Sequence, residues 1–418
     1  MTGRKIAVIG GGVSGITVGY ILSRDDRVTL FEADARLGGH ADTHLVVPPA
    51  GPPIGVDTGF IVYNERTYPL LTRLFAELGV VTQPAPMSMS VSCAGCGLRY
   101  AGRRGLAGLA AGLPRGRGRY LRLLTEVPRF HRAARRLLDE EESRDQTLRD
   151  FLITSGVSPY TAAHFVLPLV AAVWSCPAGT ALRYPARYLF TFLANHGMLS
   201  VAGSPQWRTV TGGSRCYVER AAKQLSEVRL GTPVRAVRRH ADHVQLYDAD
   251  GQPHRFDAVV IATHPDQALR LLDPPSAAER AVLGAFAYTP NPAILHTDSG
   301  VLPGRHTRAS WNYQLSGCRP DNAAVRISYH LNRLQDLRAG QDYIVTLGGA
   351  DVVDPGQILD RLDYAHPVYT PASVAAQRRL PELNANRTAF AGAYHGWGFH
   401  EDGARSGAAA ARALGGSW

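Results

Sequence analysis

The residues best suited to chemistry lie near the start of the chain, where Gly10, Gly12 and Gly15 form the pattern G-x-G-x-x-G that binds a dinucleotide pyrophosphate. Gly10 permits a tight turn, Gly12 lets the backbone approach a phosphate, and Gly15 lets a helix pack closely on a strand. Ser14 lies within the pattern, at a predicted helix N-terminus whose free N–H groups attract phosphate. Glu32 follows Gly10 by about 20 residues, the distance expected for an acid that binds a ribose 2′-OH. An acid there disfavours a 2′-phosphate, so the pattern predicts NAD or FAD rather than NADP.

Three elements must position these glycines and this acid. The apolar run at residues 5–9 is too short for a helix and predicts a buried strand. Residues 16–22 predict a helix, and residues 28–31 predict a second strand that ends beside the acid. Strand, glycine turn, helix, strand and acid together are typical of a dinucleotide-binding βαβ unit. A glycine-rich turn without a ligand is the less favoured alternative.

The segment at residues 32–40, Glu-Ala-Asp-Ala-Arg-Leu-Gly-Gly-His, resembles the extension that follows this unit in the flavin-containing amine oxidase superfamily. The resemblance implies that Gly38 and Gly39 fold a loop over the FAD pyrophosphate. It also implies that His40 takes the place of a basic residue, which is usually arginine in that family. NAD dehydrogenases do not need this loop, so the resemblance favours FAD as the cofactor.

Further segments resemble the same superfamily in the expected order. Asp-Thr-Gly-Phe at residues 57–60 resembles a turn that lies against the flavin, with a plain β-turn as the alternative. Residues 387–393 resemble the last strand of the family, but the final alanine stands where members usually have an acid. Gly403-Ala404 resembles the start of a closing helix whose N–H groups face flavin O2. The resemblance thus implies further FAD contacts from Thr58, Gly59, Phe60, Val234, Thr263, Gly392, Ala393, Gly403 and Ala404.

His400 and Glu401 are the candidate acid/base pair, because their place just before Gly403 is expected to put them beside the flavin ring. Capping of the closing helix or contact with the cofactor is the alternative explanation for both. The amine oxidases of the family place a lysine near flavin N5, in the substrate half of the chain. Lys5 and Lys223 are the only lysines here, and both fall in the predicted cofactor half. Amine oxidation is therefore the second choice.

A hydrophobic substrate is the first choice. Residues 174–177, 205–214 and 398–403 resemble a bacterial group of FAD proteins related to fatty-acid double-bond isomerases and to desaturases of methyl-branched acyl lipids. The resemblance implies hydride transfer from an acyl chain or lipid-like molecule to flavin N5, in desaturation or double-bond isomerisation. A flavin-bound subunit that assists a partner enzyme, without turnover of its own, is a further alternative.

The resemblance also implies a domain organisation. We expect an α/β fold, in which a Rossmann-like, amine-oxidase-like FAD-binding domain carries an inserted α+β substrate domain. The FAD-binding domain is expected at residues 1–75, 205–284 and 380–418. A helical insert at residues 76–204 and a sheet at residues 285–379 are expected to form the substrate-binding domain.

Charge and targeting signals narrow the function classes. The 418 residues carry a net charge of +10, almost all from arginine. No zinc finger, helix-turn-helix or aromatic-basic strand motif accompanies this charge, so we expect no nucleic-acid partner.

The first predicted strand starts at Lys5 and leaves no room for a signal peptide, so a cytoplasmic protein is expected. Residues 119–138 predict a basic amphipathic helix, which is either the outer layer of a domain or a contact with the inner membrane face.

Five cysteines are scattered along the chain, and we expect reduced thiols. Cys93 and Cys96 form a single C-x-x-C without a second pair at zinc spacing. The alternating residues 87–92 in front of it predict a hairpin with glycines in the turn. We therefore expect a hairpin tip rather than a redox or metal site, and we predict no metal ligands.

Overall fold

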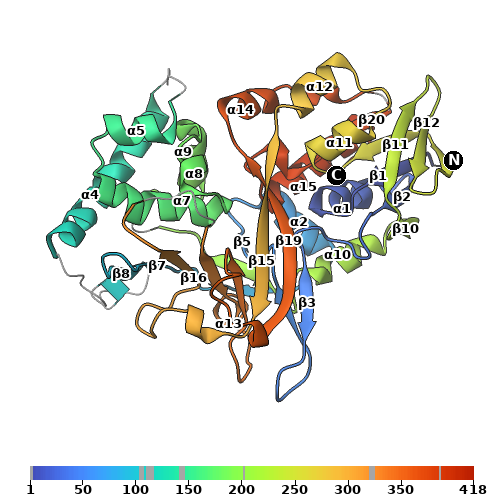
Figure 1. Ribbon diagram of the computed structural model, residues 1–418. Coiled ribbons are helices and arrows are strands. Elements are labelled where there is room, and N and C mark those ends of the chain that lie inside the picture. Colours follow the sequence, from blue (N-terminus) through green and yellow to red (C-terminus); the bar gives the residue numbers. More distant parts are fainter. Residues whose placement is uncertain are drawn as a thin grey trace.

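The computed structural model places a helical lobe beside a lobe that holds both chain ends, with two long strands between them (Figure 1). It describes residues 3–102, 108–109, 117–140, 146–200, 203–319, 325–385 and 387–418. In these ranges no helix is long and apolar enough to cross a membrane.

A parallel sheet lies at the centre of the lobe that holds the chain ends. Its order is β10 (Glu227–Arg229), β2 (Arg27–Phe31), β1 (Lys5–Ile9), β14 (Ala258–Ile261) and β20 (Thr388–Phe390). The strands come from the beginning, the middle and the end of the chain, so the sheet forms only when these distant segments meet. Its inner strands are buried at nearly every residue, as expected for a parallel sheet covered on both faces.

Successive residues of β1 point to opposite faces of this sheet. Ile6 and Val8 pack into one hydrophobic cluster, and Ala7 and Ile9 pack into another. The helices of the first cluster are α1 (Val13–Leu22), α2 (Pro69–Glu77), α10 (Arg215–Ala222) and α15 (His400–Ala413). The elements of the second cluster are β11 (Val234–Arg239), β12 (Val244–Asp248), β13 (Pro253–Phe256), α11 (Pro265–Leu271), α12 (Ala277–Leu283) and α14 (Pro371–Gln377).

A second, mixed sheet carries the two long strands seen between the lobes (Figure 1). Its order is β19 (Ile358–Val368), β15 (Ala287–His296), β18 (Ile344–Leu347), β17 (Ile327–His330), β16 (Trp311–Leu315), β7 (Met89–Cys93) and β8 (Arg99–Gly102). The short helix α13 (Leu331–Leu334) follows β17. The described residues also form three small sheets. The first pairs β3 (Thr43–Val46) with β4 (Ile54–Asp57), the second has the order β5 (Tyr63–Asn64), β9 (Trp207–Val210) and β6 (Thr82–Pro84), and the third has the order β11, β12 and β13.

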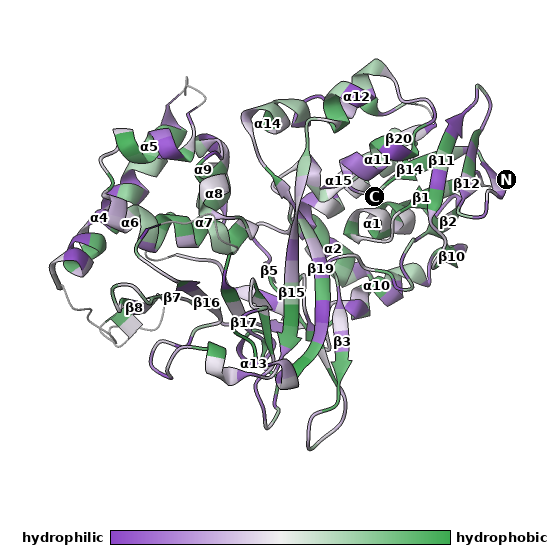
Figure 2. Ribbon diagram, in the orientation of Figure 1, coloured by the Kyte–Doolittle hydropathy of each residue, from purple (hydrophilic) through white to green (hydrophobic). Residues whose placement is uncertain are grey.

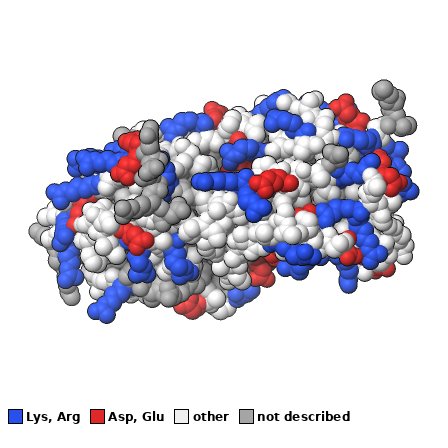
Figure 3. Space-filling view, turned by 90° about the horizontal axis from the view of Figure 1, so that it is seen from above, with Lys and Arg blue, Asp and Glu red and all other residues white. Residues whose placement is uncertain are grey.

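The helical lobe is built around an aromatic core. Its elements are α4 (Arg117–Asp139), α5 (Leu148–Thr154), α6 (Pro159–Thr161), the π-helical turn η1 (Ala162–Val166), α7 (Leu167–Trp174), α8 (Ala178–Ala181) and α9 (Ala186–Asn195). Phe130 meets the rings of Phe151 and Phe190 edge-on, with centroids 6.1 and 5.7 Å away. The hydropathy colours of Figure 2 show α7, like α1, as mostly hydrophobic. Basic side chains cover much of the face in Figure 3 and are interspersed with acidic ones.

The predicted α/β fold with a Rossmann-like sheet is confirmed, and so is the β7–β8 hairpin. The first helix begins at Val13 rather than at residue 16, because the glycine turn is shorter than expected. The parallel strands fall within residues 1–75, 205–284 and 380–418, and the mixed sheet falls within the remaining two ranges. The domain boundaries themselves stay a prediction.

Candidate functional site

The first glycine turn forms a cradle in which side chains at Gly10 and Gly15 would clash. Gly10 has a φ of 103°, and its N–H donates to the Phe31 carbonyl over 2.8 Å. A Cβ at Gly15 would lie 1.9 Å from the Gly10 carbonyl oxygen, so only glycine lets α1 pack this closely on β1. Gly12 caps the N-terminus of α1, and a Cβ there would meet no described atom within 4 Å. Gly12 therefore borders open space next to the unpaired N–H groups of the helix.

The second glycine pair lies directly on the first turn. The Gly38 N–H donates to the Gly11 carbonyl over 2.8 Å, and a Cβ at Gly39 would lie 3.3 Å from the Gly12 Cα. Glu32, at the end of β2, accepts the Gly11 N–H over 2.6 Å. Turn, loop and acid thus form one connected unit.

His40 differs from the basic residue implied by the resemblance. Burial lowers its pKa well below 6.5, so the imidazole is neutral at pH 7, and the ring stacks on Tyr364 with centroids 4.9 Å apart. The cation of this loop is Arg36, whose Nη2 lies 2.8 Å from Asp42 Oδ2. Asp42 also accepts the Tyr364 hydroxyl over 3.0 Å. Positive charge beside the glycine pair therefore comes from Arg36.

The Thr58-Gly59-Phe60 turn packs against the same loop. The Phe60 N–H donates to the His40 carbonyl over 2.7 Å, and the Thr58 N–H donates to the Asp42 carbonyl over 2.9 Å. A Cβ at Gly59 would lie 2.3 Å from the His40 carbonyl oxygen. The three predicted residues are therefore beside the glycine pair, held by backbone contacts.

The closing helix α15 approaches α1 through small residues. A Cβ at Gly403 would lie 2.5 Å from Val13 Cγ1, and a Cβ at Gly407 would lie 2.6 Å from the Ser14 carbonyl oxygen. Ala404 has no exposed surface. Glycine and alanine thus let the last helix of the chain pack on the first one.

The remaining predicted residues follow the carboxyl ends of the parallel strands. Gly10 follows β1, Thr263 follows β14, and Gly392 and Ala393 follow β20. Since neighbouring parallel strands end at the same edge of a sheet, these residues lie along one edge, where such folds bind ligands. Val234 begins β11. The Thr232 N–H, two residues earlier, donates to the Glu32 carbonyl, so Val234 lies close to Glu32.

The side chains of His400 and Glu401 make different contacts. The His400 and Phe60 rings stack with centroids 3.6 Å apart, and burial lowers the pKa of His400 to about 3. Glu401 accepts the N–H groups of Leu70 and Leu71 over 3.1 and 3.0 Å, at the first turn of α2. Burial raises the pKa of Glu401 to about 7. The acid/base role of the pair stays a prediction.

The residues at this edge fit FAD. Gly12 and the N-terminus of α1 offer space and N–H donors for a pyrophosphate, and Glu32 offers a carboxylate for a ribose. Among the described residues, the buried Nε2 atoms of His40 and His400 have no hydrogen-bond partner. Leaving such atoms unpaired costs about 1–3 kcal/mol each, which a polar cofactor would offset. Bound FAD supplies a ring that accepts hydride.

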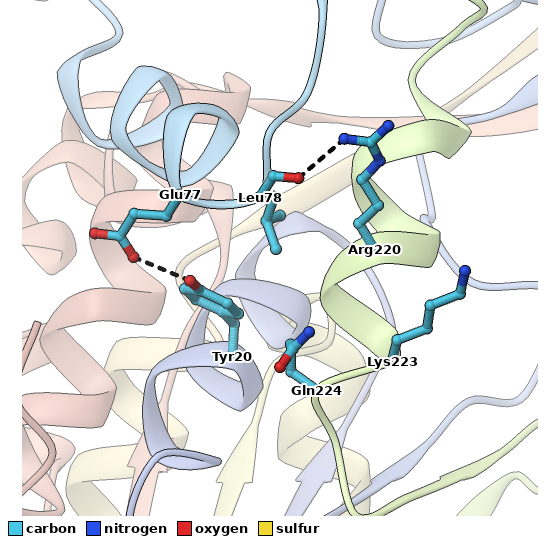
Figure 4. A pocket seen from close by; sticks show the side chains of 6 residues that line it. All are labelled: Tyr20, Glu77, Leu78, Arg220, Lys223 and Gln224. Atoms are coloured by element: carbon cyan, nitrogen blue, oxygen red, sulfur yellow. Dashed lines mark hydrogen bonds between the residues drawn. The ribbon is translucent and has the colours of Figure 1, made fainter.

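Neither lysine lies at this edge of the sheet. Lys5 is exposed at the amino end of β1, opposite to the glycine turn. Lys223 directly follows α10 and lines a surface pocket of about 340 Å³ (Figure 4). The other residues of that pocket are Tyr20, Glu77, Leu78, Arg220 and Gln224.

An aromatic wall joins the helical lobe to the segment before α15. The rings of Phe399 and Phe192 stack with centroids 4.5 Å apart, and Trp174 lies edge-on to Phe399 at 6.2 Å. The Trp174 Nε1–H donates to the Trp397 carbonyl over 3.1 Å. The wall next to His400 is thus apolar.

A parallel sheet whose carboxyl edge carries two glycine turns, an acid and a closing helix is typical of a dinucleotide-binding protein. The family model for flavin containing amine oxidoreductase matches residues 13–415, and the chain belongs to that family. The protein is therefore an FAD-dependent enzyme, as the sequence predicted.

Known proteins resemble the chain over nearly its whole length. A coproporphyrinogen III oxidase of Mycobacterium tuberculosis is 28% identical, with 91% of this chain and 90% of that protein aligned. Cyclohexylamine oxidase from Brevibacterium oxydans superposes with a TM-score of 0.70 at 16% identity, covering 99% of this chain and 98% of that one. A CLA-producing fatty acid isomerase from P. acnes gives a TM-score of 0.69 at 16% identity and covers 98% of both chains.

Sequence reasoning missed several residues that hold the site together. Arg36 lies inside the segment that resembles the family, so its charge was a usable signal. Asp57 accepts the Ser214 N–H over 2.9 Å and the Thr43 hydroxyl over 2.6 Å, and burial raises its pKa to about 7. Tyr364 gave no signal, because its partners lie far away in the sequence.

Proposed function

We propose that this FAD-dependent oxidoreductase acts on a hydrophobic acyl-chain or lipid-like substrate, by desaturation or by double-bond isomerisation. The observation that carries the proposal is the aromatic wall of Phe399, Phe192 and Trp174 beside the start of α15. An apolar chain that leaves water for such a wall gains about 25 cal/mol per Å² of buried surface. The shared fold of the P. acnes fatty acid isomerase supports this substrate class.

His400 is the proposed proton-transfer residue. The His400 ring is neutral and stacks on the ring of Phe60. Phe60 belongs to the turn that is expected to face the flavin. Glu401, whose two carboxylate oxygens accept backbone N–H groups of α2, acts in this proposal by positioning that helix beside His400.

Porphyrinogen oxidation is a second candidate. The coproporphyrinogen III oxidase of Mycobacterium bovis aligns over 90% of its own length, so the likeness extends through both sheets. Its substrate carries several carboxylates, which arginine binds well. The absence of a lysine from the substrate half argues against amine oxidation for this chain.

An anaerobic titration tests these candidates. The holoenzyme is mixed without oxygen with oleic acid, with coproporphyrinogen III or with putrescine, and flavin absorbance is followed. We expect oleic acid either to bleach the flavin or to yield an isomer with a shifted double bond, detected by gas chromatography. His400→Gln should keep FAD and lose at least tenfold in this activity, about 1.4 kcal/mol of transition-state stabilisation. Reaction with porphyrinogen or amine alone would overturn the acyl proposal.

We also propose that α4 contacts an anionic membrane surface. The apolar side chains of Leu121 and Leu124 are 58% and 37% exposed on this helix. Each basic residue near an anionic surface contributes about 1 kcal/mol to binding. The exposed arginines of α4 are Arg119, Arg122, Arg129, Arg132, Arg135 and Arg136.

Vesicle sedimentation tests this contact. Binding to phosphatidylglycerol vesicles should exceed binding to neutral phosphatidylcholine vesicles, and Arg129→Gln with Arg132→Gln should reduce it at least threefold. Because basic side chains also lie elsewhere on the surface, Arg235→Gln with Arg338→Gln is the matched control. Equal losses of vesicle binding in both double variants would mean that the net charge of the protein, rather than α4, causes the binding.

A further inference from the structure

Four side chains of metal-ligand type converge beneath α7, although they come from three parts of the chain. They are Cys93 at the end of β7, Cys96 in the turn to β8, His164 in η1 and Cys318 after β16. Their ligand atoms all lie within 4.8 Å of one another. Figure 1 shows β7 and β16 side by side below α7.

The distances match a single tetrahedral ion. Cys93 Sγ and Cys318 Sγ lie 3.9 Å apart, and Cys96 Sγ and His164 Nε2 lie 3.6 Å apart. A zinc ion with Zn–S bonds of about 2.3 Å spaces its sulfur ligands by roughly 3.8 Å. The sulfur atoms are too far apart for a disulfide, whose S–S bond is about 2.0 Å, and all five cysteines are free.

The imidazole is oriented as a metal ligand. His164 Nδ1 lies 2.9 Å from the Tyr160 carbonyl, to which only an N–H can donate. That bond leaves the lone pair on Nε2, the nitrogen that faces the Cys96 sulfur. A hydrogen bond from the second ring nitrogen to a carbonyl is the usual support of a metal-bound histidine. His164 is completely buried in a π-helical turn, a feature that often marks functional sites.

The hairpin tip is a tight turn that glycine makes possible. The Gly97 N–H donates to the Cys93 carbonyl over 2.9 Å, and the Cys93 N–H donates to the Leu98 carbonyl over 2.9 Å. Gly97 has a φ of 73°, a backbone conformation that favours glycine. These bonds hold Cys93 and Cys96 in one short turn.

The tip also packs directly on the segment that supplies the fourth ligand. A Cβ at Gly95 would lie 3.1 Å from the Gly317 Cα and 3.2 Å from the Cys318 N. The Ala94 N–H donates to the Leu315 carbonyl over 2.9 Å. Backbone contacts therefore hold Gly317 and Cys318 against the hairpin tip without any ion.

We propose that Cys93, Cys96, His164 and Cys318 bind one Zn²⁺ ion in a closed structural site. Three thiolates and one imidazole fill all four positions that zinc prefers, which leaves no position for water or substrate. The thiols release their protons to solvent when the ion binds. An iron–sulfur cluster would hold its ligands around several atoms and farther apart than this site allows.

The ion would fasten the helical lobe to the mixed sheet. η1 belongs to the lobe, β7 and β8 form the edge of that sheet, and β16 is the next strand inward. The sequence showed only the C-x-x-C pair, because the other two ligands lie 68 and 225 residues away from it. The β7–β8 hairpin expected from the sequence is present, and the proposal adds a metal site to its tip.

Metal analysis of the purified holoenzyme tests the site. We expect one zinc per chain by mass spectrometry after dialysis against EDTA, in the wild type and in Cys216→Ser, a cysteine outside the cluster. Cys318→Ser and His164→Ala should each lose at least tenfold in zinc content while they retain yellow FAD, which reports a folded cofactor lobe.

X-ray absorption spectroscopy of the wild-type protein identifies the atoms bound to zinc. This measurement does not depend on whether the variants fold. We expect three sulfur ligands at about 2.3 Å and one nitrogen at about 2.0 Å from zinc. Iron in place of zinc, a Cys93–Cys318 disulfide in unreduced peptides, or wild-type zinc content in Cys318→Ser would each overturn the proposal.

Discussion

Gly12 is the residue at which folding and cofactor binding can be separated. Its φ of −71° and ψ of 179° suit alanine, and an added Cβ meets no described atom. We expect Gly12→Ala to leave the unfolding temperature of the apoprotein unchanged. The methyl group would occupy the space needed by the pyrophosphate, so FAD affinity should fall at least tenfold, about 1.4 kcal/mol. Quenching of flavin fluorescence measures the Kd.

Two other glycines provide the comparison for this variant. Gly340→Ala places its methyl group in open surroundings far from the glycine turn and should change neither quantity. Gly15→Ala should impair both, because its Cβ would strike the Gly10 carbonyl. Wild-type FAD affinity in Gly12→Ala would contradict the assignment of the cradle.

The sequence predicted the role of a single residue wherever that residue acts through its own backbone. Glycines at fixed spacing and the acid at a strand end predict a phosphate cradle without knowledge of the fold. The role of Glu401 as a cap on α2 and the stack of His40 on Tyr364 could not be predicted, since both depend on partners hundreds of positions away.

The contact between α1 and α15 depends on the absence of side chains. A valine at Gly407 would drive its Cβ against the Ser14 carbonyl and separate the two helices. Overpacking of this kind costs about 1–3 kcal/mol. We expect Gly407→Val to lower the unfolding temperature and the FAD content of the purified protein together, both measured by absorbance.

Ala409→Val is the matched change for this element. Ala409 is exposed on the same helix, so valine there costs only the small difference in helix propensity. Equal losses in the two variants would mean that propensity, rather than the close approach of α1, controls the effect.

Element types were easier to predict than element ends. The short apolar runs of β1 and β14 and the alternation before the β7–β8 hairpin have periods that fix the type of structure. The π-helical turn η1 carries no such period, because a single i→i+5 turn between α6 and α7 is too short to repeat a pattern.

Across the whole molecule, buried histidines make stability depend on pH. Burial lowers the pKa of His131, His196 and His296 to about 4, so the unfolded chain binds protons between pH 6.5 and 4 that the folded chain does not. Stability from these groups is present above pH 6.5 and is lost as the pH falls toward 4. The unfolding temperature should therefore fall between pH 7 and pH 5.

His131→Phe isolates one of these contributions. Its ring lies 5.8 Å from that of Phe165, so phenylalanine fits an aromatic site. Between pH 7 and pH 5 the free energy of unfolding should fall in both proteins. The fall should be smaller in the variant, by up to about 2 kcal/mol, as measured by urea unfolding. Asp57 and Glu401, whose pKa values burial raises to about 7, act in the opposite direction but are the same in both proteins. An unchanged pH dependence would contradict the assignment.

The sequence predicted the fold class through motifs shared with a family. It did not predict which segments far apart in the sequence come into contact. The convergence of the hairpin tip, η1 and the loop after β16 follows from the order of strands in the mixed sheet. No local pattern contains that order.

The arrangement of the parallel sheet has a consequence for synthesis on the ribosome. Its outer strand β20 and the helix α15 are the last elements of this sequence to be translated, whereas β1 and α1 are the first. Until they emerge, β14 presents an unpaired edge and α1 an uncovered apolar surface, both of which favour aggregation. Closure of the flavin-binding edge consequently requires that β20 and α15 have been translated.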